Sequence, residues 1–247
     1  MNDVYDVTIE DVKSENDTVS SIFIKPKPEI FNTAKAGQYL LIRLRKNTGW
    51  TEFHPFTLTN NLKDELIKIT VKKVGQFTTI LHSLKLPTAV QVKGPLGTFG
   101  KEIDESKRCV FIAGGIGITP FISLLEYLRQ NKSEMQITLF WANENSNDLF
   151  YLDKLEQYCK ELNFKTVLII NTKIETGLRD RYGFIYEEGF LKKEILARYV
   201  NKDASFYMCG SPNMQNYIFS QLKEIEIPTE KVNIESIGLY MNVEIAH

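Results

Sequence analysis

A glycine-rich stretch of the chain could bring its backbone close to a phosphate-bearing ligand. Residues 113–120 read Ala-Gly-Gly-Ile-Gly-Ile-Thr-Pro and follow a short apolar run. Gly114, Gly115 and Gly117 permit close backbone approach, and Pro120 suits the first turn of a helix whose N–H groups attract a pyrophosphate. The pattern is GxGxxP, which departs from the usual GxGxxG dinucleotide fingerprint. Alone, such a turn also has a purely structural explanation.

A second glycine turn occurs in residues 71–81, Val-Lys-Lys-Val-Gly-Gln-Phe-Thr-Thr-Ile-Leu. A β-rich run leads into Gly75 and then into a helix start that carries the hydroxyls of Thr78 and Thr79. Backbone amides and hydroxyls at such a junction can hold a phosphate group. A simple capped helix is the alternative explanation.

Residues 209–214, Cys-Gly-Ser-Pro-Asn-Met, form another strand-to-helix junction. Ser211 suits the N-cap and Pro212 the first helical position. In a parallel sheet, the carboxyl ends of the strands face the crevice where ligands bind, which makes Cys209 a candidate for ligand contact. Taken alone, a cysteine there is more often a small core residue.

The segment 54–59, His-Pro-Phe-Thr-Leu-Thr, places a histidine, an aromatic ring and a hydroxyl close together. Taken alone, it is explained by an ordinary β-strand. The three histidines, His54, His82 and His247, show no metal-ligand spacing, and no CxxC pair is present. The sequence therefore predicts no metal site.

The elements that must position these residues fall into two groups, of which the first is rich in strands. Many short strands at regular spacing predict a small antiparallel barrel. The expected strands are 18–25, 38–44, 53–59, 66–74 and 89–93, with a short helix at 78–84.

After about residue 105, strands alternate with helices, which predicts a parallel, doubly wound sheet. A charged segment at 101–107 marks the boundary between the two groups. The expected strands are 110–113, 137–141, 167–170, 205–208 and 232–235, and the expected helices are 120–129, 148–162, 190–199 and 212–225.

The composition excludes several other classes of protein. Of the 247 residues, 43% are hydrophobic and 25% are charged, which rules out a disordered or collagen-like chain. The 30 basic and 31 acidic residues give a net charge of −1, without the basic excess that duplex nucleic acid requires. Arg43, Arg45 and Lys46 are interpreted as a solvated strand end, with docking of an acidic partner as the alternative.

The sequence also favours a cytoplasmic location. The first residues lack the basic start and apolar run of a signal peptide, and the uncharged stretch 109–125 is too short for a comfortable membrane span. The odd number of cysteines, Cys109, Cys159 and Cys209, gives no disulfide framework. A reducing compartment is therefore expected.

In combination, these segments and Gly-Pro-Leu-Gly-Thr-Phe at 94–99 resemble the ferredoxin–NADP reductase superfamily of flavoproteins over nearly the whole chain. HPFTL is similar to the flavin motif Arg-x-Tyr-Ser/Thr, in the form found in the ferric-reductase and NADPH-oxidase branch. GGIGITP and CGSPNM are the most specific pair. The resemblance implies a six-stranded antiparallel flavin-binding β-barrel in residues 1–102. It also implies an NAD(P)-binding α/β domain with a Rossmann-like parallel sheet in 103–247.

The resemblance further implies roles for single residues. Phe56 is expected to pack on the isoalloxazine ring and Thr57 to hydrogen-bond flavin N5. Cys209 is expected near the reacting nicotinamide carbon and Glu235 near the flavin, so Thr57, Cys209 and Glu235 are the expected catalytic residues. The expected cofactor contacts are His54, Pro55, Phe56, Thr57, Leu58, Thr59, Val71, Lys73, Gly75, Gln76, Phe77, Thr78, Thr79, Gly114, Gly115, Gly117, Thr119, Pro120, Asn143, Glu144, Arg181, Cys209, Gly210, Ser211 and Met214.

The chain departs from the family pattern at three places. His54 replaces the usual arginine, so a weaker or differently arranged contact with the flavin phosphates is expected. Ile237 stands where many relatives carry an aromatic residue, and the tail 239–247 does not match the aromatic C-terminus of plant-type members.

The choice between NADH and NADPH depends on the end of the second strand of the α/β domain. Glu144 there suits a ribose hydroxyl and repels a 2′-phosphate. Lys173, Arg179 and Arg181 could instead clamp that phosphate. The sequence slightly favours NADH.

The sequence thus predicts an oxidoreductase that depends on FAD, with FMN as the less favoured flavin, and that passes electrons from NADH or NADPH to a separate acceptor. The acceptor classes are a ferredoxin, a flavodoxin, a haem protein or a ferric chelate. Three alternatives stay open: an electron-transfer subunit of a larger complex, a nucleotide-binding module without turnover, and a plain Rossmann dehydrogenase.

Overall fold

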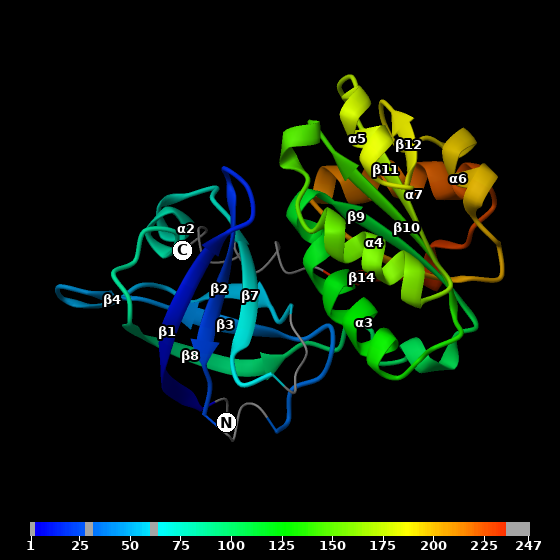
Figure 1. The fold of residues 1–247 in the computed structure, drawn as a ribbon. Coiled ribbons are helices and arrows are strands. Elements are labelled where there is room, and N and C mark those ends of the chain that lie inside the picture. Colours follow the sequence, from blue (N-terminus) through cyan, green and yellow to red (C-terminus); the bar gives the residue numbers. More distant parts are fainter. Residues whose placement is uncertain (1–2, 28–31, 60–63, 236–247) are drawn as a thin grey trace.

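The N-terminal half of the chain folds into six antiparallel strands that close into a barrel. A computed structural model describes residues 3–27, 32–59 and 64–235. The strand order is β6-β3-β8-β1-β2-β7 (Figure 1). The barrel closes where Leu58 pairs with Ile69 and the Thr59 amide donates to the Lys68 carbonyl over 2.7 Å. The elements are β1 (Val4–Ser14), β2 (Val19–Lys25), β3 (Tyr39–Arg43), β4 (Arg45–Lys46), β5 (Gly49–Trp50), β6 (His54–Thr57), β7 (Ile67–Lys72), α2 (Gln76–Leu81) and β8 (Thr88–Leu96).

Alternation of apolar and polar residues builds the barrel core. Ile22 and Ile24 of β2 are fully buried, and so is Ile69 of the neighbouring β7. The strand β1 was not among the predicted strands, because acidic residues mask its pattern. In the structure, Val7 and Ile9 nonetheless lie in the core, two residues apart, as strand geometry requires.

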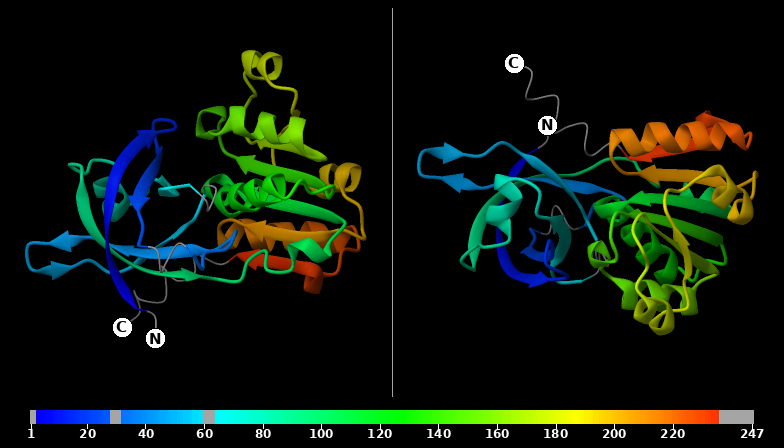
Figure 2. Two further views of the ribbon diagram at one scale, coloured as in Figure 1. Left: turned by 60° about the horizontal axis from the view of Figure 1, so that its bottom comes forward. Right: turned by 90° about the horizontal axis from the view of Figure 1, so that it is seen from above.

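The C-terminal half folds into a parallel six-stranded sheet with helices on both faces (Figures 1 and 2). The helices α3 and α4 cover one face, and α6 and α7 cover the other. The elements are β9 (Arg108–Gly114), α3 (Thr119–Gln130), β10 (Gln136–Asn143), α4 (Leu152–Glu161), β11 (Phe164–Ile170), α5 (Thr176–Arg181), β12 (Ile185–Glu188), α6 (Lys193–Tyr199), β13 (Ser205–Cys209), α7 (Pro212–Glu224) and β14 (Val232–Glu235), with 3₁₀ turns η1 (Ile103–Glu105), η2 (Gly115–Ile118), η3 (Ser146–Asp148) and η4 (Thr229–Lys231).

The strand order β12-β11-β10-β9-β13-β14 confirms the doubly wound sheet. The strands β10, β11 and β12 lie in succession on one side of β9, whereas β13 and β14 lie on its other side. In such sheets the ligand crevice lies where the strand order reverses, so the carboxyl ends of β9 and β13 border it. The segments GGIGITP and CGSPNM follow β9 and β13 respectively.

The predicted helix ends differ from the observed ones in physically simple ways. The helix expected at 148–162 begins only at Leu152, because 146–148 form a 3₁₀ turn and Tyr151 has a left-handed backbone, with φ 58°. The helix expected at 190–199 begins at Lys193. Neither α5 nor β12 was predicted, since six and four residues are too few for a clear periodic pattern. The tail 239–247 and Ile237 lie outside the described residues.

The two domains meet along one side of the barrel. Lys72 of β7 pairs with Asp148 over 3.0 Å, and the Asn16 amide donates to the carbonyls of Asn147 and Leu149. Val19 of β2 is fully buried in the core of the α/β domain. Apolar packing therefore continues from one domain into the other.

Within the α/β domain, a buried carboxylate joins α3 to α4. Glu126 is 5% exposed, accepts hydrogen bonds from Arg129 and Tyr158, and lies 3.5 Å from the Lys154 ammonium. Burial alone would raise the pKa of Glu126, but these donors and charges outweigh it and lower the pKa to about 2.

Replacing Glu126 with Gln should therefore cost about 2–4 kcal/mol of unfolding free energy at neutral pH. A depressed carboxyl pKa stabilises the fold above the ordinary value of 4.5, and this contribution is lost as the pH falls through about 2. Urea unfolding of E126Q and the wild type across this range should show the difference closing toward low pH. A pH-independent difference would contradict the assignment, and E134Q, at an exposed site, is the control.

Candidate functional site

The two domains bring two buried hydroxyls together at their junction. Thr57, the last residue of β6, is 3% exposed, and Thr119, the first residue of α3, is 7% exposed. The Thr119 hydroxyl donates to the Thr57 hydroxyl over 3.4 Å. The HPFT strand of the barrel thus meets the end of the GGIGITP turn, although the two lie far apart in the sequence.

The glycines of the GGIGITP turn have different neighbours. A Cβ on Gly117 would lie 2.4 Å from the Cys209 carbonyl oxygen, and one on Gly114 would lie 2.2 Å from the Met214 sulfur. Gly117 needs glycine because the turn passes so close to the backbone of β13, whereas the neighbour of Gly114 is the end of a flexible side chain from α7. Gly115 has φ +50°, and a Cβ there would meet no atom within 4 Å, so its outer side is open. Its carbonyl accepts from the Trp141 indole N–H over 2.8 Å.

Cys209 and Glu235 are neighbours at the carboxyl edge of the sheet. They are paired residues of β13 and β14 and are 7% and 8% exposed. Burial, assisted by the Glu235 carboxylate, raises the pKa of the Cys209 thiol to about 12. Cys209 is therefore a neutral thiol, suited to contact with an uncharged ring and not to nucleophilic attack.

The carboxyl end of β10 carries polar atoms without partners. Both side-chain amide atoms of Asn143, which is 8% exposed, and the Ser146 hydroxyl are buried and have no hydrogen-bond partner among the described residues. Such groups are costly unless something satisfies them. An unpaired amide at this end of a nucleotide-binding type of sheet fits a polar ligand.

Next to Asn143, the Glu144 carboxylate is held by the Asn171 amide over 2.9 and 3.0 Å. The two arginines considered for a phosphate clamp have acidic partners of their own. Arg179 lies 3.7 Å from Glu188, and Arg181 lies 3.4 Å from Asp153. The side chain fixed at the end of β10 is thus an acid.

On the barrel side, three rings gather at the HPFT strand. His54 stacks on Phe77 with 3.9 Å between ring centroids, and Phe56 lies 6.1 Å from the same ring. Phe56 and His54 are only partly buried. This cluster provides an aromatic surface beside Thr57.

The predicted phosphate loop at Gly75 is held by one of its own side chains. The Thr78 hydroxyl accepts from the Val74 and Gly75 amides over 2.9 and 3.0 Å, so it caps its own loop. Thr79 and Gln76 are exposed. The capped-helix alternative describes Thr78, whereas Gln76 and Thr79 face outward.

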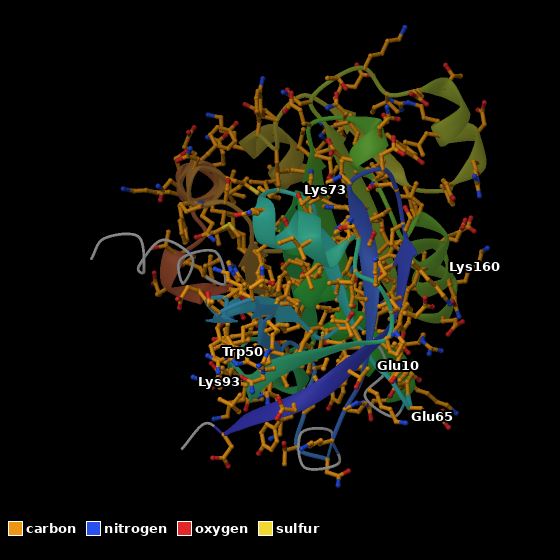
Figure 3. The ribbon with its side chains drawn as sticks, turned by 90° about the vertical axis from the view of Figure 1, so that its left-hand side faces the viewer. Glu10, Trp50, Glu65, Lys73, Lys93 and Lys160 are labelled. Carbon is orange, nitrogen blue, oxygen red and sulfur yellow. The ribbon has the colours of Figure 1, made fainter. Side chains whose placement is uncertain are left out.

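Most of the other residues expected to contact a cofactor are buried or make contacts within the protein. Leu58 and Val71 lie in the barrel core, and Thr59 bonds to Thr70 over 2.9 Å. Pro55 and Pro120 are buried, and Lys73 is exposed at the α2 end of the barrel, apart from Trp50 and Lys93 (Figure 3). At the start of α7, Gly210 packs on Met214 and Ser211 caps the helix.

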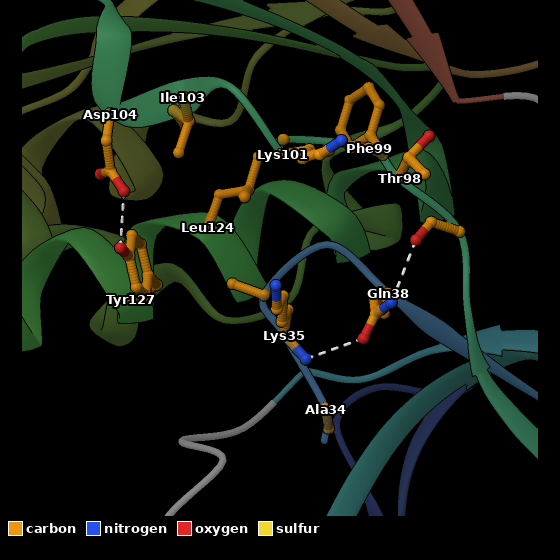
Figure 4. A pocket seen from close by; sticks show the side chains of 13 residues that line it. Ala34, Lys35, Gln38, Thr98, Phe99, Lys101, Ile103, Asp104, Leu124 and Tyr127 are labelled. Atoms are coloured by element: carbon orange, nitrogen blue, oxygen red, sulfur yellow. Dashed lines mark hydrogen bonds between the residues drawn. The ribbon is translucent and has the colours of Figure 1, made fainter. Parts of the chain in front are cut away.

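Two cavities flank the segment 97–101. One, of about 560 Å³, is bordered by Lys35, Gln38, Leu124 and Tyr127 (Figure 4). The other, of about 520 Å³, reaches Glu235, and no other expected site residue lines either cavity.

Among residues 3–27, 32–59 and 64–235, no group of acidic, histidine or cysteine side chains could hold a metal ion. Within the same residues, no helix has the length and apolar character needed to cross a membrane.

Sequence reasoning missed three residues that shape the site. Trp141 fixes Gly115, Asn171 fixes Glu144, and the Tyr151 hydroxyl bonds to the barrel hydroxyls of Ser21 and Thr70. Each acts through a partner distant in sequence. The only local signal was the position of Trp141 at the end of the strand predicted at 137–141.

Family models match both halves of the chain. An FAD-binding domain model matches residues 4–137, and an oxidoreductase NAD-binding domain model matches residues 111–219. The flavohemoprotein of Bacillus subtilis (strain 168) is 28% identical over 233 residues, which cover 91% of this chain and 57% of that protein. The F component of the Na(+)-translocating NADH-quinone reductase of Neisseria gonorrhoeae (strain ATCC 700825 / FA 1090) is 28% identical over 167 residues, 66% of this chain and 41% of that protein. The chain spans about half the length of these relatives.

Solved structures share the fold. Flavohemoglobin from Malassezia yamatoensis with bound FAD and heme superposes with a TM-score of 0.79 at 23% identity, over 94% of this chain and 59% of that one. A ferredoxin NADP+ reductase from Neisseria gonorrhoeae with bound FAD and NADP gives 0.75 at 15% identity, over 94% and 98%. At such identities the likeness establishes the fold, and it confirms the predicted pair of domains.

The two glycines Gly115 and Gly117 should respond differently to substitution. Gly117→Ala should cost about 2–4 kcal/mol, because its methyl group would meet the Cys209 carbonyl in a junction that cannot easily move. Gly115→Ala should cost only about 1 kcal/mol, from the positive φ alone. Urea unfolding measures both, and equal losses would contradict the packing role of Gly117.

Proposed function

The chain belongs to the family of oxidoreductases that join an FAD-binding domain to an NAD-binding domain, and we propose that it carries electrons from a nicotinamide dinucleotide through FAD to a separate acceptor. The family models confirm the resemblance inferred from HPFTL and GGIGITP. The observation that most supports the proposed activity is the contact between Thr57 and Thr119, because it joins the flavin motif to the nucleotide turn.

The residues present fit both cofactors. The open side of Gly115 and the unpartnered Asn143 amide suit the pyrophosphate and a polar part of the nicotinamide dinucleotide. The half-buried Phe56 and the Thr57 hydroxyl suit an aromatic ring with a hydrogen-bonding edge. Gln76 and Thr79, which face outward, are the loop residues proposed for the flavin phosphates.

When bound, FAD supplies a centre that takes up two electrons together and can release them singly. The chain's task is alignment. Thr57 is proposed to orient the flavin through its hydroxyl, which neither gains nor loses charge at neutral pH. Cys209 offers a neutral, polarisable surface, and Glu235 is proposed to act through its charge beside that thiol. Alignment of reacting groups accounts for a large part of such rates, so no acid–base pair is required.

We propose NADH as the preferred donor. Glu144 is held by Asn171 at the end of β10, where a carboxylate accepts from ribose hydroxyls and repels a 2′-phosphate. Arg179 and Arg181 are engaged with Glu188 and Asp153. This arrangement supports the preference that the sequence indicated only slightly.

The acceptor is proposed to be a redox protein or a small oxidant, and a haem protein is one candidate because a flavohemoprotein is among the relatives. The match to a component of a quinone reductase supports a second candidate function, an electron-transfer subunit of a larger complex. The domain boundary is proposed at 102/103, between β8 and β9. The three free cysteines support the cytoplasm as the proposed compartment.

Replacing Thr57 with Ala should slow reduction of bound FAD by NADH about tenfold, because one orienting hydrogen bond contributes about 1–2 kcal/mol. Thr57→Ser keeps the hydroxyl and should restore most of the rate. Anaerobic stopped-flow absorbance of the FAD-loaded variants measures this, with FAD affinity measured separately. An alanine variant as fast as the wild type would remove Thr57 from the proposed site.

Replacing Glu144 with Ser should improve use of NADPH relative to NADH about tenfold, since a repulsion of about 1–2 kcal/mol is removed. The ratio of kcat/KM for the two dinucleotides reports it. The control is Glu134→Ser, an exposed acid that precedes β10 at the opposite edge of the sheet. An unchanged ratio in E144S would contradict the ribose role.

A further inference from the structure

Tyr151 is a residue of the α/β domain whose side chain forms hydrogen bonds with the barrel. Its hydroxyl bonds to the Ser21 hydroxyl of β2 and, over 2.8 Å, to the Thr70 hydroxyl of β7. The Lys68 ammonium lies 4.8 Å from the centre of the tyrosine ring. Burial raises the pKa of Tyr151 to about 12, so the hydroxyl keeps its proton.

The hydrogen bonds of Tyr151 have a defined direction. Ser21 donates its only hydroxyl proton to the Glu15 carboxylate, so Tyr151 must be the donor to Ser21. Thr70 can then donate to Tyr151 while it accepts from Thr59, whose hydroxyl proton is shared with the Lys68 carbonyl 3.2 Å away. Thr59 lies two residues after Thr57 in the strand that carries the flavin motif. The hydroxyl of Tyr151 is therefore tied to the chain that holds Thr57.

On its other side, Tyr151 is tied to the nucleotide turn. The Tyr151 ring packs on Phe150, with centroids 5.1 Å apart, and Phe150 packs edge-on against Trp141 at 5.3 Å. Trp141 donates its indole N–H to the Gly115 carbonyl. Phe150 and Trp141 are buried, so this series of contacts contains no flexible surface side chain.

We propose that Tyr151 is a positioning residue that sets the placement of the Gly115 turn relative to Thr57, and thereby the alignment of the two cofactors. The inference rests on the proposed function. In this proposal Tyr151 contacts neither cofactor and only sets the position of one domain relative to the other.

Two further observations support this role. Tyr151 has φ 58°, a conformation that costs a non-glycine residue about 1–3 kcal/mol and persists only where the surroundings hold it. The Lys72–Asp148 ion pair, which also joins the two domains, is a weaker constraint, because it is partly exposed and such pairs typically contribute about 0–1 kcal/mol. The buried hydroxyl is thus the more exacting contact.

The helix α4, which begins directly after Tyr151, provides a matched control. Tyr158 is fully buried, and its hydroxyl donates over 2.9 Å to Glu126 inside the α/β domain. Tyr158→Phe removes one buried hydroxyl without touching the barrel. Tyr151→Phe removes one that crosses to the barrel and keeps the ring.

The first experiment measures flavin reduction in the FAD-loaded protein at increasing NADH, under anaerobic conditions. We expect Y151F to lower the limiting rate about tenfold or more while the Kd for NADH changes less than about threefold, because alignment is lost and the binding residues remain. Y158F should keep the wild-type rate. Equal rates in Y151F and Y158F would overturn the proposal. A wild type that is not reduced by NADH would instead refute the proposed function.

The second experiment needs no cofactor. Hydrogen–deuterium exchange of the unloaded protein should show faster exchange in 146–151 and in β2 for Y151F, but not for Y158F. Ser21→Ala removes the same bond from the barrel side and serves if Y151F does not fold. It should reproduce the loss of rate, and the double variant should be no slower than the slower single one. Wild-type exchange and rate in S21A would overturn the proposal.

Discussion

The central constraint in this molecule is that one site is divided between two domains. The hydroxyls of Thr57 and Thr119 lie 3.4 Å apart, one on the barrel and one on the first turn of α3. Under the proposed function, the barrel holds FAD and the α/β domain holds the nicotinamide dinucleotide. Reaction between two bound groups depends on their separation and orientation, so the placement of one domain on the other is part of the chemistry. The buried contacts around Val19 and Tyr151 maintain that placement.

Close packing of the sheet explains features that are easily attributed to the ligand alone. Gly117 faces the Cys209 carbonyl, so the close approach of the turn to β13 requires glycine there, whereas Gly114 faces the flexible Met214 side chain of α7. Gly115 alone of the three is open on its outer side. The glycine-rich turn therefore serves two purposes: it brings neighbouring strands together and leaves one backbone stretch accessible. Cys209 is at the same junction, where burial keeps its thiol neutral.

The sequence predicted the two domains and most of their strands because hydrophobic periodicity and turn residues act locally. It also proposed Thr57 and Thr119, whose hydroxyls meet across the domain junction, and Cys209, whose carbonyl lies against the same glycine turn. It left open whether Thr78 caps its own loop, and it could not predict that Asn171 holds Glu144, since that bond depends on the final fold. The strand β1 was not predicted, because its acidic residues obscure the alternation of apolar and polar positions.

The central claim is that a flavin held at this junction receives electrons directly from a nicotinamide dinucleotide. The most direct measurement is an anaerobic titration of the FAD-loaded wild-type protein with NADH, followed by the visible absorbance of the flavin. The account predicts complete bleaching at about one NADH per flavin. A protein that binds no FAD, or whose bound FAD keeps its colour in excess NADH and NADPH, would contradict it.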